Sequence, residues 1–79
     1  MKFIELHLGS YIISHGYDDF NKELTEEVAV EGFTPKTIAV NRIKSLSESY
    51  ILTDYLDGRW IYWEYKEDYS QVKEQLTNI

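Results

Sequence analysis

The chain contains no cysteine, so neither a disulfide nor a thiolate zinc site can hold its fold together. Long hydrophobic runs are also missing, and no stretch approaches the roughly 20 apolar residues needed to cross a membrane. The first residues, MKFIELHLGS, alternate apolar side chains with Glu5 and His7, which is not the pattern of a signal peptide. From these absences we expect a cytoplasmic protein that does not enter a membrane.

Basic residues are scarce as well. Eight Lys and Arg stand against fourteen Asp and Glu, which gives a formal net charge of −6. Only Lys36, Arg42 and Lys44 come close to a cluster. Binding a phosphate backbone needs a local excess of Lys and Arg, so the composition argues against a nucleic-acid ligand. An acidic surface that imitates DNA phosphates stays open as an alternative.

The usual parts of a catalytic site are missing too. The four glycines stand too far apart for a phosphate-binding loop, and no serine lies in a nucleophile-elbow motif. We therefore expect no enzymatic activity, no cofactor and no small-molecule substrate. His15, Asp18 and Asp19 are ligand-type side chains at close spacing, and they are the candidate set for a metal ion. The same carboxylates could instead cap a helix.

What is present is a chain of 79 residues with 15% aromatic side chains, which suits a single small domain over residues 1–79. Period-2 alternation predicts a strand over residues 2–8, and a short second strand could follow over residues 11–14. Residues 18–27 favour a short helix capped by Asp18, although the β-branched alternation in EEVAVEGF also suits a strand.

The second half carries clearer signals. Strands are expected over residues 37–40, 50–55 and 59–65, with Asp57–Gly58 as the hairpin turn between the last two. Asp68 and Gln71 stand three apart, as in a capping box, and so predict the start of a C-terminal helix. The apolar stripe of that helix would be Tyr69, Val72, Leu76 and Ile79. The fold class expected is α+β, a small antiparallel sheet of about four to five strands with this helix packed on one face.

The second half also matches a known pattern: a strand that ends in Asn41, two aliphatic residues, an Asp-Gly hairpin and a short amphipathic helix. It runs through TIAVNRIKSLSES and YILTDYLDGRWIYWEYKEDYSQVKEQL. The pattern resembles the FlbD-type flagellar small-protein family and related short proteins of bacteria and phages, and the MKFIEL opening is similar too. The matching positions are Ile38, Val40, Asn41, Ile43, Leu46, Gly58, Glu67 and Val72. Residues 9–36 intervene where the family passes directly between strands. The resemblance implies a bacterial or phage protein without catalytic residues.

The strand over residues 59–65 has four aromatic side chains within six positions. Side chains alternate between the two faces of a strand, so both faces are aromatic here. One face would carry Ile61, Trp63 and Tyr65, and we expect it to pack beneath the C-terminal helix. The other would carry Trp60 and Tyr62, and its role is the question that this sequence raises.

Two interpretations of the second face stay open. The inserted residues 9–36 could fold over it as a second small core, because a small domain leaves little apolar area bare. It could instead bind a partner, because Trp, Tyr and Arg dominate the contacts that hold protein interfaces together. The candidate partner-binding residues are Trp60, Tyr62, Arg59, Tyr50 and Tyr55.

The function expected from the sequence is therefore a non-catalytic protein–protein interaction module of bacterial or phage origin. The partner would be another protein or a second copy, and we expect a homodimer through the aromatic face. One alternative is an acidic inhibitor that blocks a nucleic-acid-binding host protein. A second alternative is a small metal-dependent enzyme or sensor that uses His15, Asp18 and Asp19.

Overall fold

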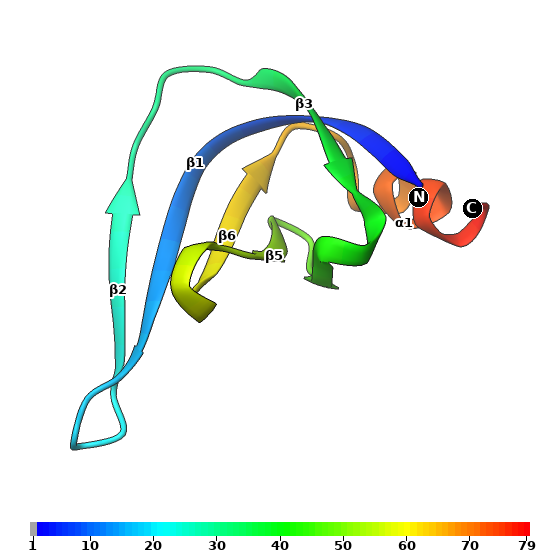
Figure 1. Cartoon of the computed structure of the whole chain (residues 1–79). Coiled ribbons are helices and arrows are strands. Elements are labelled where there is room, and N and C mark those ends of the chain that lie inside the picture. Colours follow the sequence, from blue (N-terminus) through cyan, green and yellow to red (C-terminus); the bar gives the residue numbers. More distant parts are fainter. Residues whose placement is uncertain (1) are drawn as a thin grey trace.

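The computed structural model describes residues 2–79, which form one six-stranded antiparallel sheet and one α-helix (Figure 1). The strands are β1 (Phe3–Tyr17), β2 (Glu23–Val28), β3 (Thr34–Ala39), β4 (Ile43–Leu46), β5 (Tyr50–Asp54) and β6 (Trp60–Tyr65), and the helix is α1 (Tyr69–Thr77). The order across the sheet is β2-β1-β6-β5-β4, and β3 pairs with β1. The expected α+β class is confirmed, with six strands rather than four or five.

The longest element is β1, which has 15 residues and arches over the core (Figure 1). Its N-terminal part pairs with β3, and its C-terminal part pairs with β2 on one side and β6 on the other. The prediction of two separate strands here was wrong. Gly9 and Ser10 lie at a register shift between Leu8 and Tyr11, so the chain bulges at this point without leaving the sheet.

The helix predicted over residues 18–27 is absent, and this prediction was wrong. Residues 18–22 form a tight turn, and β2 then returns along β1 as a hairpin. The Asp18 carboxylate does act as a cap, but for the turn: it accepts hydrogen bonds from the backbone N–H groups of Phe20 and Lys22, each at 2.9 Å. The alternating residues of β2 gain a full ladder from pairing with β1, which outweighs a marginal helix propensity.

The second half follows the expected order. Asp57 and Gly58 both take positive φ, 59° and 73°, in the turn between β5 and β6, so the predicted turn is confirmed. A 3₁₀ turn over Val40–Arg42 follows β3, and β4 then pairs with β5 across a register shift between Ile43 and Ser45.

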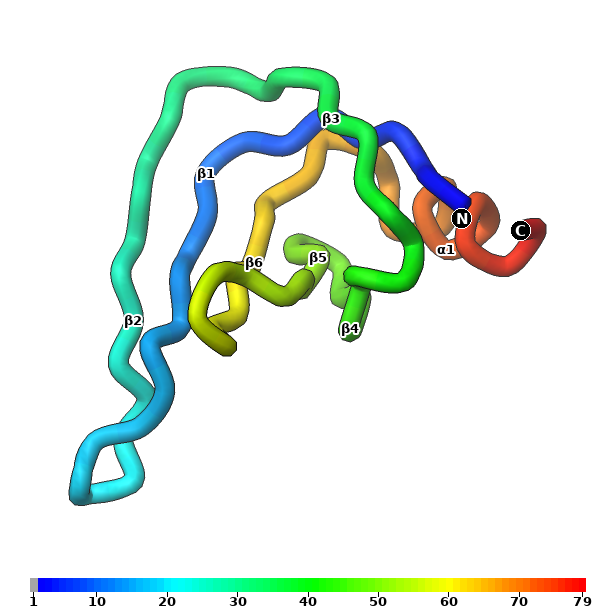
Figure 2. The backbone as a smooth tube through the Cα atoms, in the orientation of Figure 1, coloured from blue at the N-terminus to red at the C-terminus, as the bar shows by residue number. Residues whose placement is uncertain are grey.

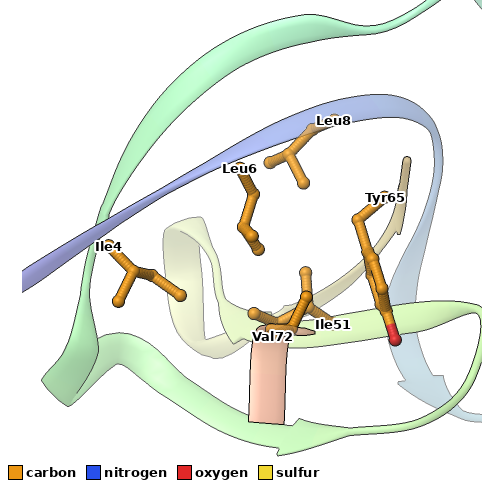
Figure 3. Packing of buried hydrophobic residues seen from close by; sticks show 6 residues of the cluster. All are labelled: Ile4, Leu6, Leu8, Ile51, Tyr65 and Val72. Atoms are coloured by element: carbon orange, nitrogen blue, oxygen red, sulfur yellow. The ribbon is translucent and has the colours of Figure 1, made fainter. Parts of the chain in front are cut away.

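The core lies on the inner side of the arch. It consists of Ile4, Leu6, Leu8, Ile51, Tyr65 and Val72, whose side chains converge in Figure 3. Trp63 packs against this cluster, and Ile61 is 1% exposed, so the face expected to be buried is the core face. Asp68 and Gln71 form the predicted capping box of α1. Of the helical stripe, Val72 and Leu76 pack on the core, whereas Tyr69 and Ile79 stay partly exposed.

Beyond the end of β6, the backbone of Lys66 and the side chain of Glu67 form hydrogen bonds with His7 at the edge of β1. The Lys66 N–H donates to the carbonyl oxygen of His7, and the Glu67 carboxylate then accepts from the His7 backbone N–H at 3.1 Å. The same carboxylate lies 2.8 Å from His7 Nδ1. Burial alone would raise the pKa of Glu67, but these hydrogen bonds from His7 outweigh it and hold the pKa below its usual value.

The β1–β2 hairpin extends away from the rest of the molecule, which is clearest in the backbone trace (Figure 2). The radius of gyration is 13.2 Å. A compact chain of this length would have about 11.6 Å, so the hairpin accounts for an elongated shape. Phe20 stands at the tip of the hairpin and is 90% exposed. No helix within the described residues is long and apolar enough to span a membrane.

Candidate functional site

The sheet has a second face, opposite the core, which we call the open face. Strand register places its residues in rows: Thr25, Ser14, Trp60 and Asp54 in one, and Glu27, Ile12, Tyr62 and Leu52 in the next. Glu64 and Tyr50 pair in the row after that. These positions alternate with the core positions of the same strands, so the face runs across four strands.

Aromatic rings are the main feature of the open face. Trp60 is 46% exposed although it begins a strand in the middle of the sheet. Tyr62 lies beside it in β6 and is half-buried, and the Tyr50 ring meets the Tyr62 ring edge-on with centroids 6.4 Å apart. Three rings therefore follow β5 and β6 on the side away from the core.

The inserted residues 9–36 do not cover these rings. The strand residues of this segment continue β1 and form β2 and the start of β3, which pair within the sheet and so lie beside the three rings (Figures 1 and 2). The segment brings bulky groups to the two ends of β6 only: the Tyr17 ring lines a groove beside Trp60 and Tyr62, and the Phe33 ring closes on Gly9 near the other end. Of the two interpretations of the second face, the fold-over of residues 9–36 is therefore wrong.

Carboxylates surround the rings. Glu23, Glu27 and Glu64 lie on the open face, and within residues 2–79 none of them has a Lys, Arg or His within 4.0 Å. Asp54 differs, because the Arg42 Nε donates to it at 2.7 Å. That hydrogen bond lowers the pKa of Asp54. The open face is thus aromatic and acidic together.

A groove of about 350 Å³ lies at the end of the open face, where the β1–β2 hairpin meets β6. Tyr17, Glu23, Trp60 and Tyr62 line it. Its volume falls within the range of about 300–1,000 Å³ that is usual for small-ligand sites. Burial, together with the nearby Glu23 carboxylate and the Tyr17 hydroxyl, raises the pKa of Tyr62.

The structure separates the predicted partner-binding residues. Trp60, Tyr62 and Tyr50 lie together on the open face. Tyr55 lines a different groove, on the core side of the sheet. The Arg59 guanidinium lies over the Tyr55 ring, 5.2 Å from its centroid, although Arg59 also lines the groove beside Trp60 and Tyr62.

The predicted metal candidates do not form a site. His15 Nε2 lies 3.1 Å from a Glu26 carboxylate oxygen, and Asp18 is occupied with the backbone of the hairpin turn. Across the part of the chain that the structure describes, no group of three or more His, Asp or Glu side chains is arranged to hold a metal ion.

Two of the three clustered basic residues are engaged within the fold. The Lys36 Nζ lies 4.3 Å from the centre of the Trp63 ring, which also contacts Tyr11. Arg42 pairs with Asp54. Lys36 therefore lies on the core side of the sheet, and the charge of Arg42 is balanced by Asp54 at the margin of the open face.

Sequence reasoning missed Ser14, Tyr17 and Glu23 as members of the site. They come together because β2 pairs with β1. The incorrect prediction of a helix over residues 18–27 excluded that pairing. The available signal was the β-branched alternation in EEVAVEGF, which suits a strand.

Comparison with known proteins adds no relative: no family model, no curated protein and no solved structure matches this chain. The resemblance to the FlbD-type family stays a prediction.

Proposed function

We propose that this chain is a non-catalytic protein-interaction module that docks onto a partner protein through its open face. The observation that carries this proposal is the exposure of Trp60, with Tyr62 and Tyr50 beside it, on the sheet face opposite the main core cluster. Trp and Tyr offer large contact area at low entropic cost, and they are enriched among the residues that dominate binding energy.

The charge of the face favours a basic partner. Glu23, Glu27 and Glu64 surround the rings and form no ion pair within the described residues 2–79, so a basic surface would neutralise them on docking. A second copy of this chain would bring the same carboxylates opposite one another and add another net charge of −6. Electrostatics therefore supports a heterotypic complex over the homodimer expected from the sequence.

Inhibition of a nucleic-acid-binding protein is a second candidate function within this proposal. Its support is again the group of Glu23, Glu27 and Glu64 on one face, which form no ion pair in the described part of the chain. The nucleic-acid site of such a protein is itself basic and would attract them. Under this candidate, the chain and a nucleic acid compete for one surface. Added salt should then weaken the complex.

Site-specific photocrosslinking in cells of the source organism tests the docking proposal. A photoreactive amino acid replaces Trp60 in one variant and Phe3 in the control. Phe3 is 56% exposed and lines the groove on the core side of the sheet. We expect an adduct with a basic protein from position 60 and none from position 3. Charge reversal by Glu27→Lys with Glu64→Lys should reduce the adduct.

Three results would count against the proposal in different ways. An absent adduct at position 60, or equal adducts at both positions, overturns docking through the open face. An adduct between two copies of the chain supports docking but overturns the preference for a basic partner. An adduct that is insensitive to the two charge reversals also removes the electrostatic argument.

A further inference from the structure

The groove at the end of the open face combines aromatic rings with the Glu23 carboxylate, which forms no ion pair within residues 2–79. Tyr17 and Trp60 are 66% and 46% exposed, so both rings are open to a ligand. They reach the groove from different strands, β1 and β6, and Glu23 comes from β2. Three separate segments therefore build this one surface.

Glu23 is held in place by its neighbour. The Ser14 hydroxyl, which is 8% exposed, donates to Glu23 Oε2 at 2.8 Å. That contact orients the carboxylate without neutralising its charge. Within residues 2–79, no Lys, Arg or His approaches it within 4.0 Å. A fixed, partly desolvated carboxylate beside aromatic rings is a favourable environment for a cation.

The chain's own arginine at this groove, Arg59, is held by groups other than Glu23. Arg59 donates from Nε to the Leu56 carbonyl oxygen at 3.0 Å, and its guanidinium lies over the Tyr55 ring. A further contact joins Arg59 to Asp57 at 3.9 Å. Arg59 thus forms a wall of the groove and does not neutralise Glu23.

We propose that this groove binds a cationic side chain of the docking partner, with the guanidinium of arginine as the preferred group. The inference rests on the proposed function and deepens it by naming the group that the open face recognises. Arginine suits the groove because its planar head stacks on Trp or Tyr and donates to a carboxylate at the same time. Lysine can offer the charge, but not the stacked plane.

Binding of a small probe tests this proposal without knowledge of the partner. N-acetyl-L-arginine methylamide is titrated into the isotope-labelled chain at constant ionic strength, and the indole N–H signals are followed by NMR. We expect a saturable shift of the Trp60 signal, while the signal of Trp63, on the core face, serves as the internal reference. The corresponding lysine derivative should bind more weakly, and the neutral citrulline derivative should not bind.

Matched variants separate the local site from general attraction. Glu23→Gln and Glu27→Gln each remove one negative charge from the open face, but only Glu23 lines the groove. Glu23→Gln should weaken binding about tenfold, as expected for loss of one charge-assisted hydrogen bond, and Glu27→Gln should leave it nearly unchanged. Tyr17→Leu, at a groove position that is 66% exposed, is a second variant that keeps the Trp60 signal, and it should also weaken binding of the arginine derivative.

The outcomes are distinct from those of the crosslinking experiment. Equal effects of the two Gln variants, or equal binding of arginine and citrulline derivatives, overturn the cation groove. If the groove fails in this way while position 60 still crosslinks to a protein, docking through the open face stands. If the arginine derivative binds but no crosslink forms, the groove stands and the docking function falls.

Discussion

Removal of each tryptophan in turn is the sharpest test of how the two sheet faces differ. Trp60 and Trp63 lie three residues apart in β6, so Trp60→Ala and Trp63→Ala share the same chemistry and the same strand. Any loss of intrinsic strand preference is common to both variants. The difference in their unfolding free energies therefore reports how far each ring is packed.

The structure predicts a larger loss for Trp63. Its ring contacts Tyr11 at a centroid distance of 4.6 Å and packs against the core cluster. Burial of about 180 Å² at about 25 cal/mol per Å² is worth about 4.5 kcal/mol. Regained rotamer freedom and the remaining methyl group return about 1 kcal/mol, which leaves about 3.5 kcal/mol.

For Trp60, which is 46% exposed, about 135 Å² of a side-chain area of about 250 Å² is buried. The same reasoning gives a loss of about 2.4 kcal/mol. The two variants should therefore differ by about 1 kcal/mol, or about 4–8 °C in Tm for a chain of this size. Total stability is expected at about 4–12 kcal/mol, so Trp63→Ala should be only marginally folded.

Urea and thermal unfolding followed by far-UV circular dichroism measures both losses. Circular dichroism is preferred because each variant lacks one of the two fluorescent tryptophans. The Trp60→Ala variant should keep the wild-type spectrum and unfold cooperatively. If it loses as much stability as Trp63→Ala, the open face is packed and unavailable to a partner, and the reasoning behind the proposed function is refuted.

Three further predictions concern the edges and turns of the sheet. Because the folded pKa of Glu67 is lowered from 4.5, its stabilising effect is present above about pH 4.5 and is lost as pH falls through the lowered pKa. The stability difference between wild type and Glu67→Gln should therefore shrink between about pH 6 and pH 3 in urea titrations, and a constant difference would contradict it. Asp18→Ala should cost about 1 kcal/mol and speed amide exchange in β2, whereas Phe20→Ser, at a side chain 90% exposed, should change stability by less than about 0.5 kcal/mol. Gly58→Ala should cost about 1 kcal/mol through backbone strain alone, since φ is 73° and nothing lies within 4 Å of the added methyl group; thermal melts that show no loss would exclude this conformation.

Several parts of the fold could be predicted because their signals are local. The capping box of Asp68 and Gln71 and the positive φ of Asp57 and Gly58 depend on residues a few positions apart. The division of the aromatic strand between two faces follows from backbone geometry, and so does the burial of Ile61. No partner from elsewhere in the chain is needed to derive these features.

The errors fall where distant residues decide. A helix over residues 18–27 and a hairpin have similar local preferences, and only the ladder between β1 and β2 favours the hairpin. Gly9 and Ser10 indicate the end of a strand in the sequence. In the structure β1 continues through the bulge, because it pairs with β6 along one edge and with β3 and β2 along the other. A short stretch of sequence gives no information about these contacts between distant residues.

The sequence by itself determined that Trp60 and Tyr62 face away from the core, because alternation along a strand is a property of the extended backbone. Only the tertiary structure decided that the rings on this face stay exposed. Residues 9–36 could have folded over the face, but they pair as strands and widen the sheet. Tertiary structure alone also placed Tyr17 and Glu23 beside Trp60, because residues more than 35 positions apart meet only through strand pairing.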